Sequence, residues 1–151
     1  MNRRAVVAII LLGAVIGGVA IQQGVVTGYE ETTVTIQDGD TEAQLVTADV
    51  RVADTVFKQY IGLSNTDSLG TTEGMLFVHE SSDRRAYVMR GMSFPIEIIF
   101  VNAAGEITTI HQAQPGDDDR FEGDGKFVLE VRLGFTDAFD IAVGDEVIVD
   151  R

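Results

Sequence analysis

The sequence predicts a mainly β protein: an antiparallel, jelly-roll-like sandwich or barrel with one or two short helices, preceded by one transmembrane helix. Three observations support this prediction. An apolar segment opens the chain, short runs of alternating apolar and polar residues follow it, and glycine-rich turns separate those runs. No regular alternation of strands with helices is visible, which argues against a doubly wound nucleotide-binding fold.

Residues 1–23 are predicted to be a membrane anchor or a signal segment. Ala5 to Ile21 carries no polar side chain, and as a helix it would span about 25 Å, the short end for a bilayer. Arg3 and Arg4 precede this run and should stay in the cytoplasm, which would place the remaining chain outside. A cleaved signal peptide has a similar start, but no clear cleavage site ends this segment. We therefore expect a single-pass protein of the cell membrane, uncleaved, with its folded domain outside the cytoplasm.

The segment from 24 to 42 is predicted to hold a juxtamembrane stretch and the first strand. "TTVTIQ" at 32–37 alternates between apolar and polar residues, and "DGD" at 38–40 contains typical turn residues. Alternation resumes in "AQLVTADVRVA" at 43–53, so we expect a hairpin. The β domain proper is assigned to residues 43–151.

One short helix is expected after this hairpin. Asp54 and Thr55 are both good N-cap residues, and apolar side chains follow at helical spacing within "VFKQYIGL". Gly62 is a natural helix stop. The helix should lie against a sheet.

The second half of the chain contains six further predicted strands and one acidic loop. The loop, residues 114–125, is rich in aspartate and glycine. Calcium favours such oxygen ligands, but the EF-hand spacing is missing, so a solvated surface is the preferred interpretation. The predicted strands are 74–79, 85–90, 95–102, 106–113, 126–133 and 144–150.

The charge composition restricts the partners that the protein can have. The net charge is −13 with few lysines, which disfavours nucleic acid and anionic membrane surfaces as partners. So acidic a surface is typical of proteins adapted to high salt, and we expect a halophilic source in preference to an acidic ion-binding protein. The chain has no cysteine, which excludes a disulfide framework, a thiolate zinc site and a cysteine nucleophile.

Common catalytic motifs are absent from the sequence. "EGDGKF" lacks both the first glycine of a P-loop and its hydroxyl residue, and the "GLSNT" and "GMSFP" stretches lack the final glycine of a nucleophile elbow. His79 and His111 end predicted strands and could meet Glu97 or Glu130 in a metal site, but their spacing is unspecific. We therefore predict no cofactor and no metal.

The stretch "YVMRGMSFPIEIIFVN", residues 87–102, contains the main candidate site residues. Arg90 lies at the break between two predicted strands, and Glu97 interrupts the apolar run that follows. Met89 and Met92 flank this corner and could either pack beneath a turn or form one wall of a binding site. The central question is whether Arg90 and Glu97 face one concavity.

Several segments, taken in order, resemble the family known as domain of unknown function 192 (DUF192), an uncharacterised protein family. The resemblance runs from about Leu45 to Val149 and implies a mainly β, jelly-roll-like sandwich in a small exported or membrane-anchored protein of bacteria or archaea. Together with the acidic composition, it suggests a haloarchaeal member. It implies no reaction. The segments are "VRVADT" at 50–55, "EGMLFVH" at 73–79, "YVMRGMSFPIEIIFVN" at 87–102, "VLEVRLG" at 128–134 and "AVGDEV" at 142–147.

Four polar positions match the family pattern in charge type, and two regions depart from it. Gly91 and Met92 stand where the family commonly has asparagine and threonine. Residues 64–66 replace a methionine and an arginine that follow the glycine-leucine pair. These departures imply a ligand specificity that differs from that of the family or has been lost. The matching positions are Asp54, Arg90, Glu97 and Glu130.

Two function hypotheses follow, with a purely structural role in the envelope as a third. The first is an extracytoplasmic accessory module that binds a small polar ligand or an envelope protein in a cleft near residues 87–97. The second is a hydrolase or carbohydrate-directed enzyme that uses paired carboxylates, with Arg90 holding an anionic group. Asp54 has the simpler alternative of capping a helix. The candidate ligand-binding residues are Arg90, Glu97, Met89, Glu130 and Asp54.

Overall fold

The computed structural model describes residues 28–150, and the chain divides into two units, residues 1–30 and residues 31–151. The fold reported below is that of the second unit. The predicted anchor and signal segment fall outside the described residues. Across 28–150, none of the helices has the length and apolar character needed to cross a bilayer.

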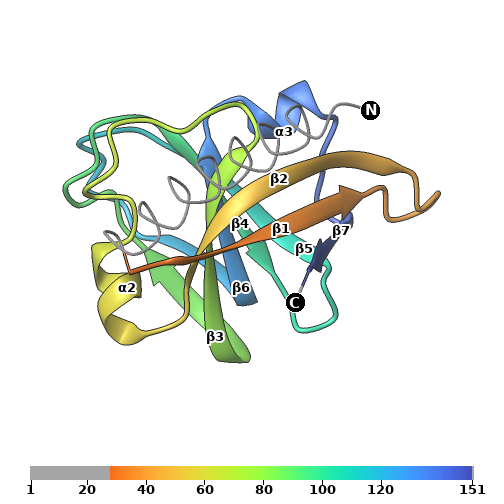
Figure 1. The fold of residues 1–151 in the computed structure, drawn as a ribbon, viewed down its shortest axis with the longest axis horizontal. Helices are drawn as coiled ribbons and strands as arrows, with labels where there is room; N and C mark the ends of the chain where they lie inside the picture. Colours follow the sequence, from red (N-terminus) through yellow and green to blue (C-terminus); the bar gives the residue numbers. More distant parts are fainter. Residues whose placement is uncertain (1–27, 151) are drawn as a thin grey trace, which may run out of the picture. The chain divides into compact units, whose positions relative to one another are not determined.

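Seven strands of the described chain form one sheet in the order β5-β4-β6-β3-β2-β1-β7. The sheet curls strongly, as Figure 1 shows, and its two edge strands approach each other. A bridge between Glu106 and Glu146 joins the edges, and Ile107 N donates to Asp145 O at 2.8 Å. The strands are β1 Glu30–Gln37, β2 Gln44–Ala53, β3 Glu73–Tyr87, β4 Ile96–Val101, β5 Ile107–Ala113, β6 Phe121–Arg132 and β7 Glu146–Val149.

Two short helices accompany the sheet within the described residues, α2 at Val56–Ile61 and α3 at Phe135–Ala138. The prediction of a mainly β fold with one or two short helices is confirmed, and the architecture is a curled half-barrel. The expected hairpin of β1 and β2 is also present, since the two strands are neighbours and Asp38 N donates to Ala43 O across the turn at 2.9 Å.

The expectation of a wholly antiparallel sheet is wrong for one pair. β2 and β3 run parallel, with Asp49 opposite Glu73 and Ala53 opposite Phe77. A parallel connection needs a dozen or more residues to carry the chain back, and residues 54–72, including α2, provide them. With only six residues, α2 is too short to give a recognisable strand–helix–strand pattern in the sequence.

β3 is one 15-residue strand where the sequence predicts two. Its register against β6 shifts between Val78 and Asp83, and β6 begins at Phe121, inside the predicted acidic loop. The polar ends of the two strands pair with each other, and Arg84 of β3 lies opposite Asp124 of β6. The polar end of β3 and the polar, glycine-containing start of β6 each have poor strand propensity alone, so pairing between them determines the structure.

The sheet buries side chains on both faces. One face forms the main core, which includes Leu76, Ile99, Leu129 and Val131 together with Phe135 of α3. On the other face, aromatic rings pack edge to face across the strands, with centroids 5.1 to 5.9 Å apart. This aromatic row consists of Phe77, Tyr87, Phe100, His111 and Phe121.

Candidate functional site

A cavity of about 450 Å³ lies at one end of the aromatic row. Its walls come from α2 and the following turn, from β3, from the chain just after β3, and from single residues of β4 and β6. The parallel β2–β3 pair brings α2 to this place, because α2 lies in the connection between them. The lining residues are Gln59–Ser64, Phe77, His79, Arg84–Val88, Arg90, Met92, Ile96 and Glu130.

Glu130 provides the carboxyl group of the cavity. It lies on β6 opposite Met75 of β3 and Ile98 of β4, and only 5% of its surface is exposed. Burial among these apolar neighbours raises the pKa of Glu130 to about 8. At neutral pH the group is therefore a protonated acid, able to donate a hydrogen bond into the cavity.

His79 and Tyr87 form a hydrogen-bonded pair in the same cavity. His79 Nε2 lies 2.8 Å from the Tyr87 hydroxyl, and the Tyr87 ring packs against Phe77 and Phe100. Desolvation, followed by the nearby positive charge of Arg85, lowers the pKa of His79 to about 4. Burial, with a smaller contribution from Glu130, raises the pKa of Tyr87 far above its ordinary value. Both groups are neutral at pH 7.

Arg90 is held by Tyr60 of α2. Its guanidinium carbon lies 4.0 Å from the centre of the Tyr60 ring, and Nη2 donates to the Tyr60 carbonyl oxygen at 2.9 Å. Gly91 follows with a φ of +70°, a left-handed conformation that glycine adopts easily, so the chain turns directly after the arginine. The guanidinium is thus fixed at the cavity wall by stacking and by one hydrogen bond.

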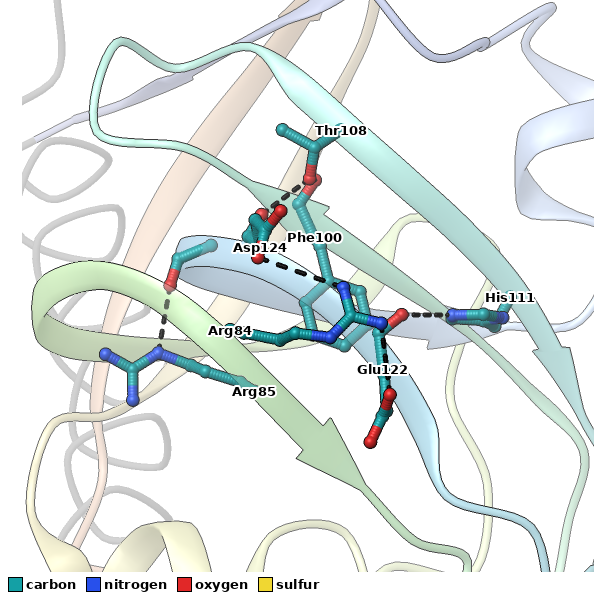
Figure 2. Close-up of polar contacts among 8 residues, drawn as sticks. Arg84, Arg85, Phe100, Thr108, His111, Glu122 and Asp124 are labelled. Carbon is teal, nitrogen blue, oxygen red and sulfur yellow. Dashed lines mark hydrogen bonds and ion pairs between the residues drawn. The ribbon is translucent and has the colours of Figure 1, made fainter.

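The other two arginines that line the cavity lie beside acidic partners. Figure 2 shows Arg84 between Glu122 and Asp124, with N–O distances of 3.0 and 3.9 Å. Arg85 lies 3.7 Å from a carboxylate oxygen of Asp83. Within residues 28–150, no acidic side chain forms an ion pair with Arg90. Arg90 therefore provides the uncompensated positive charge of the cavity.

Glu97 does not face the cavity with Arg90. It is fully buried, and its carboxylate accepts hydrogen bonds from Gly134 N at 2.8 Å and from Thr136 N at 3.0 Å. Successive residues of a strand point to opposite faces, so Ile96 lines the cavity while Glu97 points toward α3. The structure thus brings Arg90 together with Glu130 but separates both from Glu97.

The two remaining candidates from the sequence also lie outside the cavity lining. Met89 is buried, and its neighbour Met92 is the methionine that contributes to the wall. Asp54 lies 3.0 Å from Lys58 in an ion pair. The N-cap of α2 is Thr55, whose hydroxyl accepts from Lys58 N at 3.3 Å.

The sequence did not identify His79, Tyr87 and Tyr60 as one constellation. The sequence suggests His79 and His111 as possible metal ligands, but His111 Nε2 instead bonds to the Glu122 carbonyl at 2.7 Å (Figure 2). Over the part of the chain that the structure describes, no three histidine, aspartate or glutamate side chains gather at a potential metal site. The useful signal was the motif "YVMR", because Tyr87 and Arg90 both line the cavity.

Comparison with solved structures supports the fold. A Sinorhizobium meliloti 1021 protein, provisionally named a transcription regulator, matches with a TM-score of 0.75 and 21% identity over 80% of this chain and 95% of its own. A protein of unknown function from Novosphingobium aromaticivorans DSM 12444 matches with a TM-score of 0.70 and 29% identity, covering 77% and 83% of the two chains.

Comparison of sequences gives the family. A Thermococcus sibiricus protein named "UPF0127 protein" is 26% identical over 107 residues, which cover 71% of this chain and 70% of the relative. The family model of DUF192, described as "Uncharacterized ACR, COG1430", matches residues 35–149. This match includes all the residues that line the cavity. The chain therefore belongs to the DUF192 family of uncharacterised proteins.

Proposed function

We propose that the domain is a binding module for a small anionic ligand, which it holds in the cavity between α2, β3 and β6. The observation that carries this proposal is the position of Arg90, an arginine without an acidic partner in the described chain, at the wall of a cavity whose other titratable groups are neutral or ion-paired. The net charge of the whole chain is −13, so such a positive site is unusual in this protein. An anion is the ligand that this local charge favours.

Arg90 is arranged in advance for binding. Stacking on Tyr60 and donation to the Tyr60 carbonyl restrict the guanidinium before any ligand arrives. One terminal nitrogen is occupied by that carbonyl, and the remaining N–H groups can donate to a carboxylate or phosphate. Because the side chain is already ordered, less conformational entropy is lost when the ligand binds.

The interior of the cavity supplies neutral polar groups rather than charges. The protonated carboxyl of Glu130 can donate a hydrogen bond, and the His79–Tyr87 pair offers further polar atoms. These groups can recognise a hydroxyl or a second oxygen of the ligand without repelling an anion. The apolar lining, including Phe77 and Ile96, lowers the local polarity, which strengthens the polar contacts.

The alternative of an enzyme with paired carboxylates has less structural support. Hydrolysis of a glycosidic bond by that mechanism requires two carboxyl groups flanking the substrate. Among the residues that line the cavity, Glu130 alone carries one. Glu97 binds two backbone amides on the other face of the sheet, and Asp54 is ion-paired with Lys58. A binding role needs no second carboxylate.

The site of action belongs to the same proposal. We place the domain outside the cytoplasm, tethered by the N-terminal segment to the membrane of a halophilic organism. The apolar run from Ala5 to Ile21, the preceding arginines and the acidic composition support this assignment. The acidic surface also disfavours nucleic acid as a partner.

Thermal unfolding of the full chain with acetate and phosphate, each compared with the neutral isostere acetamide, tests the proposal. We expect the anions to raise Tm and acetamide to leave it unchanged, at the same KCl concentration. Arg90→Gln should weaken anion binding about tenfold by calorimetry, equivalent to about 1.4 kcal/mol.

Arg132→Gln is the matched control, because Arg132 is exposed and its guanidinium donates to Thr71 Oγ1 outside the cavity. It should bind anions like the original protein. An equal loss of anion affinity in both variants would indicate nonspecific electrostatics. Unchanged anion affinity in Arg90→Gln would refute the assignment of the site.

A further inference from the structure

Helix α2 presents a strip of large apolar side chains to solvent. Val56 is 86% exposed, Phe57 73% and Tyr60 67%, and α2 has no buried residue. These three residues are referred to below as the α2 strip. Scattered apolar residues on a surface are normal, but three on a six-residue helix of a strongly acidic protein form a patch that indicates binding.

The α2 strip continues into the cavity. Val56 and Phe57 lie four and three positions before Tyr60, so all three share one side of the helix. Tyr60 also lines the cavity and carries Arg90 on its ring. Val88, 51% exposed and another lining residue, adds to the apolar mouth. A single ligand could therefore contact the guanidinium and the exposed apolar surface together.

We propose that the ligand is an amphipathic carboxylate, a small molecule whose anionic head binds Arg90 and whose apolar chain lies along the α2 strip and Val88. This inference rests on the proposed function and specifies the ligand class. The head is assigned from charge complementarity with Arg90, the one lining arginine without an acidic partner in the described chain. The tail is assigned from the exposed side chains next to it.

The dimensions of the site agree with such a ligand. A cavity of about 450 Å³ falls in the range of small-molecule sites and accepts the head with the first few carbons. Further carbons would emerge over Tyr60 and Phe57. Each additional buried methylene should then tighten binding about fourfold, until the chain passes the end of the α2 strip.

The experiment compares acetate, butyrate, hexanoate and octanoate with the full chain by calorimetry, below micelle-forming concentrations. We expect affinity to rise at each step for the original protein. Octylamine, which is positively charged at neutral pH, and neutral octanamide should bind at least tenfold more weakly than octanoate, because they lack the anionic head that Arg90 recognises.

Phe57→Ser tests the tail contact, and Val143→Ser is its matched control. Both residues are exposed and apolar, but Val143 lies between α3 and β7 and does not line the cavity. Phe57→Ser should reduce the gain from butyrate to octanoate while leaving acetate binding unchanged. Val143→Ser should leave both the gain from butyrate to octanoate and the binding of acetate unchanged.

Four results would overturn the inference. Equal affinity for acetate and octanoate, both lost in Arg90→Gln, would refute the apolar contact while leaving the anion site intact. Octylamine binding as tightly as octanoate would refute recognition of the head. Self-association of the original protein in sedimentation, abolished by Phe57→Ser, would show that a second copy covers the α2 strip. Absence of binding by every carboxylate would refute the proposed function as well.

Discussion

Glu97 and Glu130 lie on adjacent strands and differ by one step in register, yet their carboxyl groups occupy opposite faces of the sheet. Glu97 of β4 pairs with Val131 of β6, and the next residue of β4, Ile98, pairs with Glu130. Glu97 accepts hydrogen bonds from two backbone amides near α3, whereas Glu130 faces the cavity. The first residue is therefore expected to act on stability, and the second on the chemistry of the site.

Glu97→Ala should destabilise the domain by about 2–4 kcal/mol. The substitution leaves the Gly134 and Thr136 amides without their acceptor, in a buried environment. Urea unfolding measures the change. Glu97→Gln retains one acceptor oxygen, so its stability should lie between that of Glu97→Ala and that of the original protein. Glu80→Ala, at an exposed position of β3, is the control, and equal stability of the Glu97→Ala and Glu80→Ala variants would contradict this role.

As pH rises, the Glu130→Gln variant should become more stable than the original protein. The pKa of Glu130 is raised from 4.5 to about 8 in the folded state. The folded protein therefore retains a proton that the unfolded chain releases, and stability is lost between pH 4.5 and 8, at most about 1.4 kcal/mol per pH unit. Glutamine has no such proton.

The difference in unfolding free energy between Glu130→Gln and the original protein, measured from pH 4 to 9, checks this effect. It should grow by a few kcal/mol in favour of glutamine and become constant above pH 8. A difference independent of pH would show that Glu130 titrates normally. For Glu80→Gln, at an exposed position, the difference in unfolding free energy from the original protein should hardly change with pH.

Tyr87→Phe should cost about 1 kcal/mol of stability. The variant keeps the ring contacts with Phe77 and Phe100 but removes the hydroxyl that bonds to His79. Tyr60→Phe makes the same chemical change on an exposed residue and should have little effect. Guanidinium unfolding compares the two, and identical midpoints and slopes would argue against a significant His79–Tyr87 bond.

Gly123→Ala should destabilise the domain by about 1–3 kcal/mol. A Cβ at this position would lie 2.5 Å from Phe100 Cγ, so the buried aromatic row would have to move. Gly70→Ala is the comparison, because its added methyl group meets only the side chain of Glu73, which can shift. Thermal unfolding should separate the two variants clearly, and equal Tm values would mean that the ring relaxes freely.

Much of the fold followed from the sequence because strands bury alternate residues, and this pattern is local. Local patterns correctly predicted β1, β2, β4, β5 and β7, although β4 is a continuous apolar run that is buried at all six positions. Such patterns cannot reveal which strands pair or in which direction. The parallel β2–β3 pair was therefore missed. The long β3 was missed because its polar end depends on pairing with the equally polar start of β6.

The site was predictable only in part, for the same physical reason. Arg90 and Glu130 were both named from the sequence, and both line the cavity. Glu97 is a candidate because it is an acid in an apolar run. Whether such a residue faces a cavity depends on which face of the sheet carries the cavity, and the sequence does not show this. His79 and Tyr87 could not be paired in advance, since the strand that carries both was expected to break between them.

The arrangement of the edge strands determines when the half-barrel can form during synthesis. β1 pairs with β7, and the Thr32 hydroxyl donates to the Asp150 carbonyl, 118 positions later in the chain. The early hairpin can form while translation continues, but the outer edge of β1 has no partner until β7 leaves the ribosome. Such long-range pairing generally slows folding. The finished domain is therefore expected to appear only after β7 has been synthesised, with β1 exposed to other chains until then.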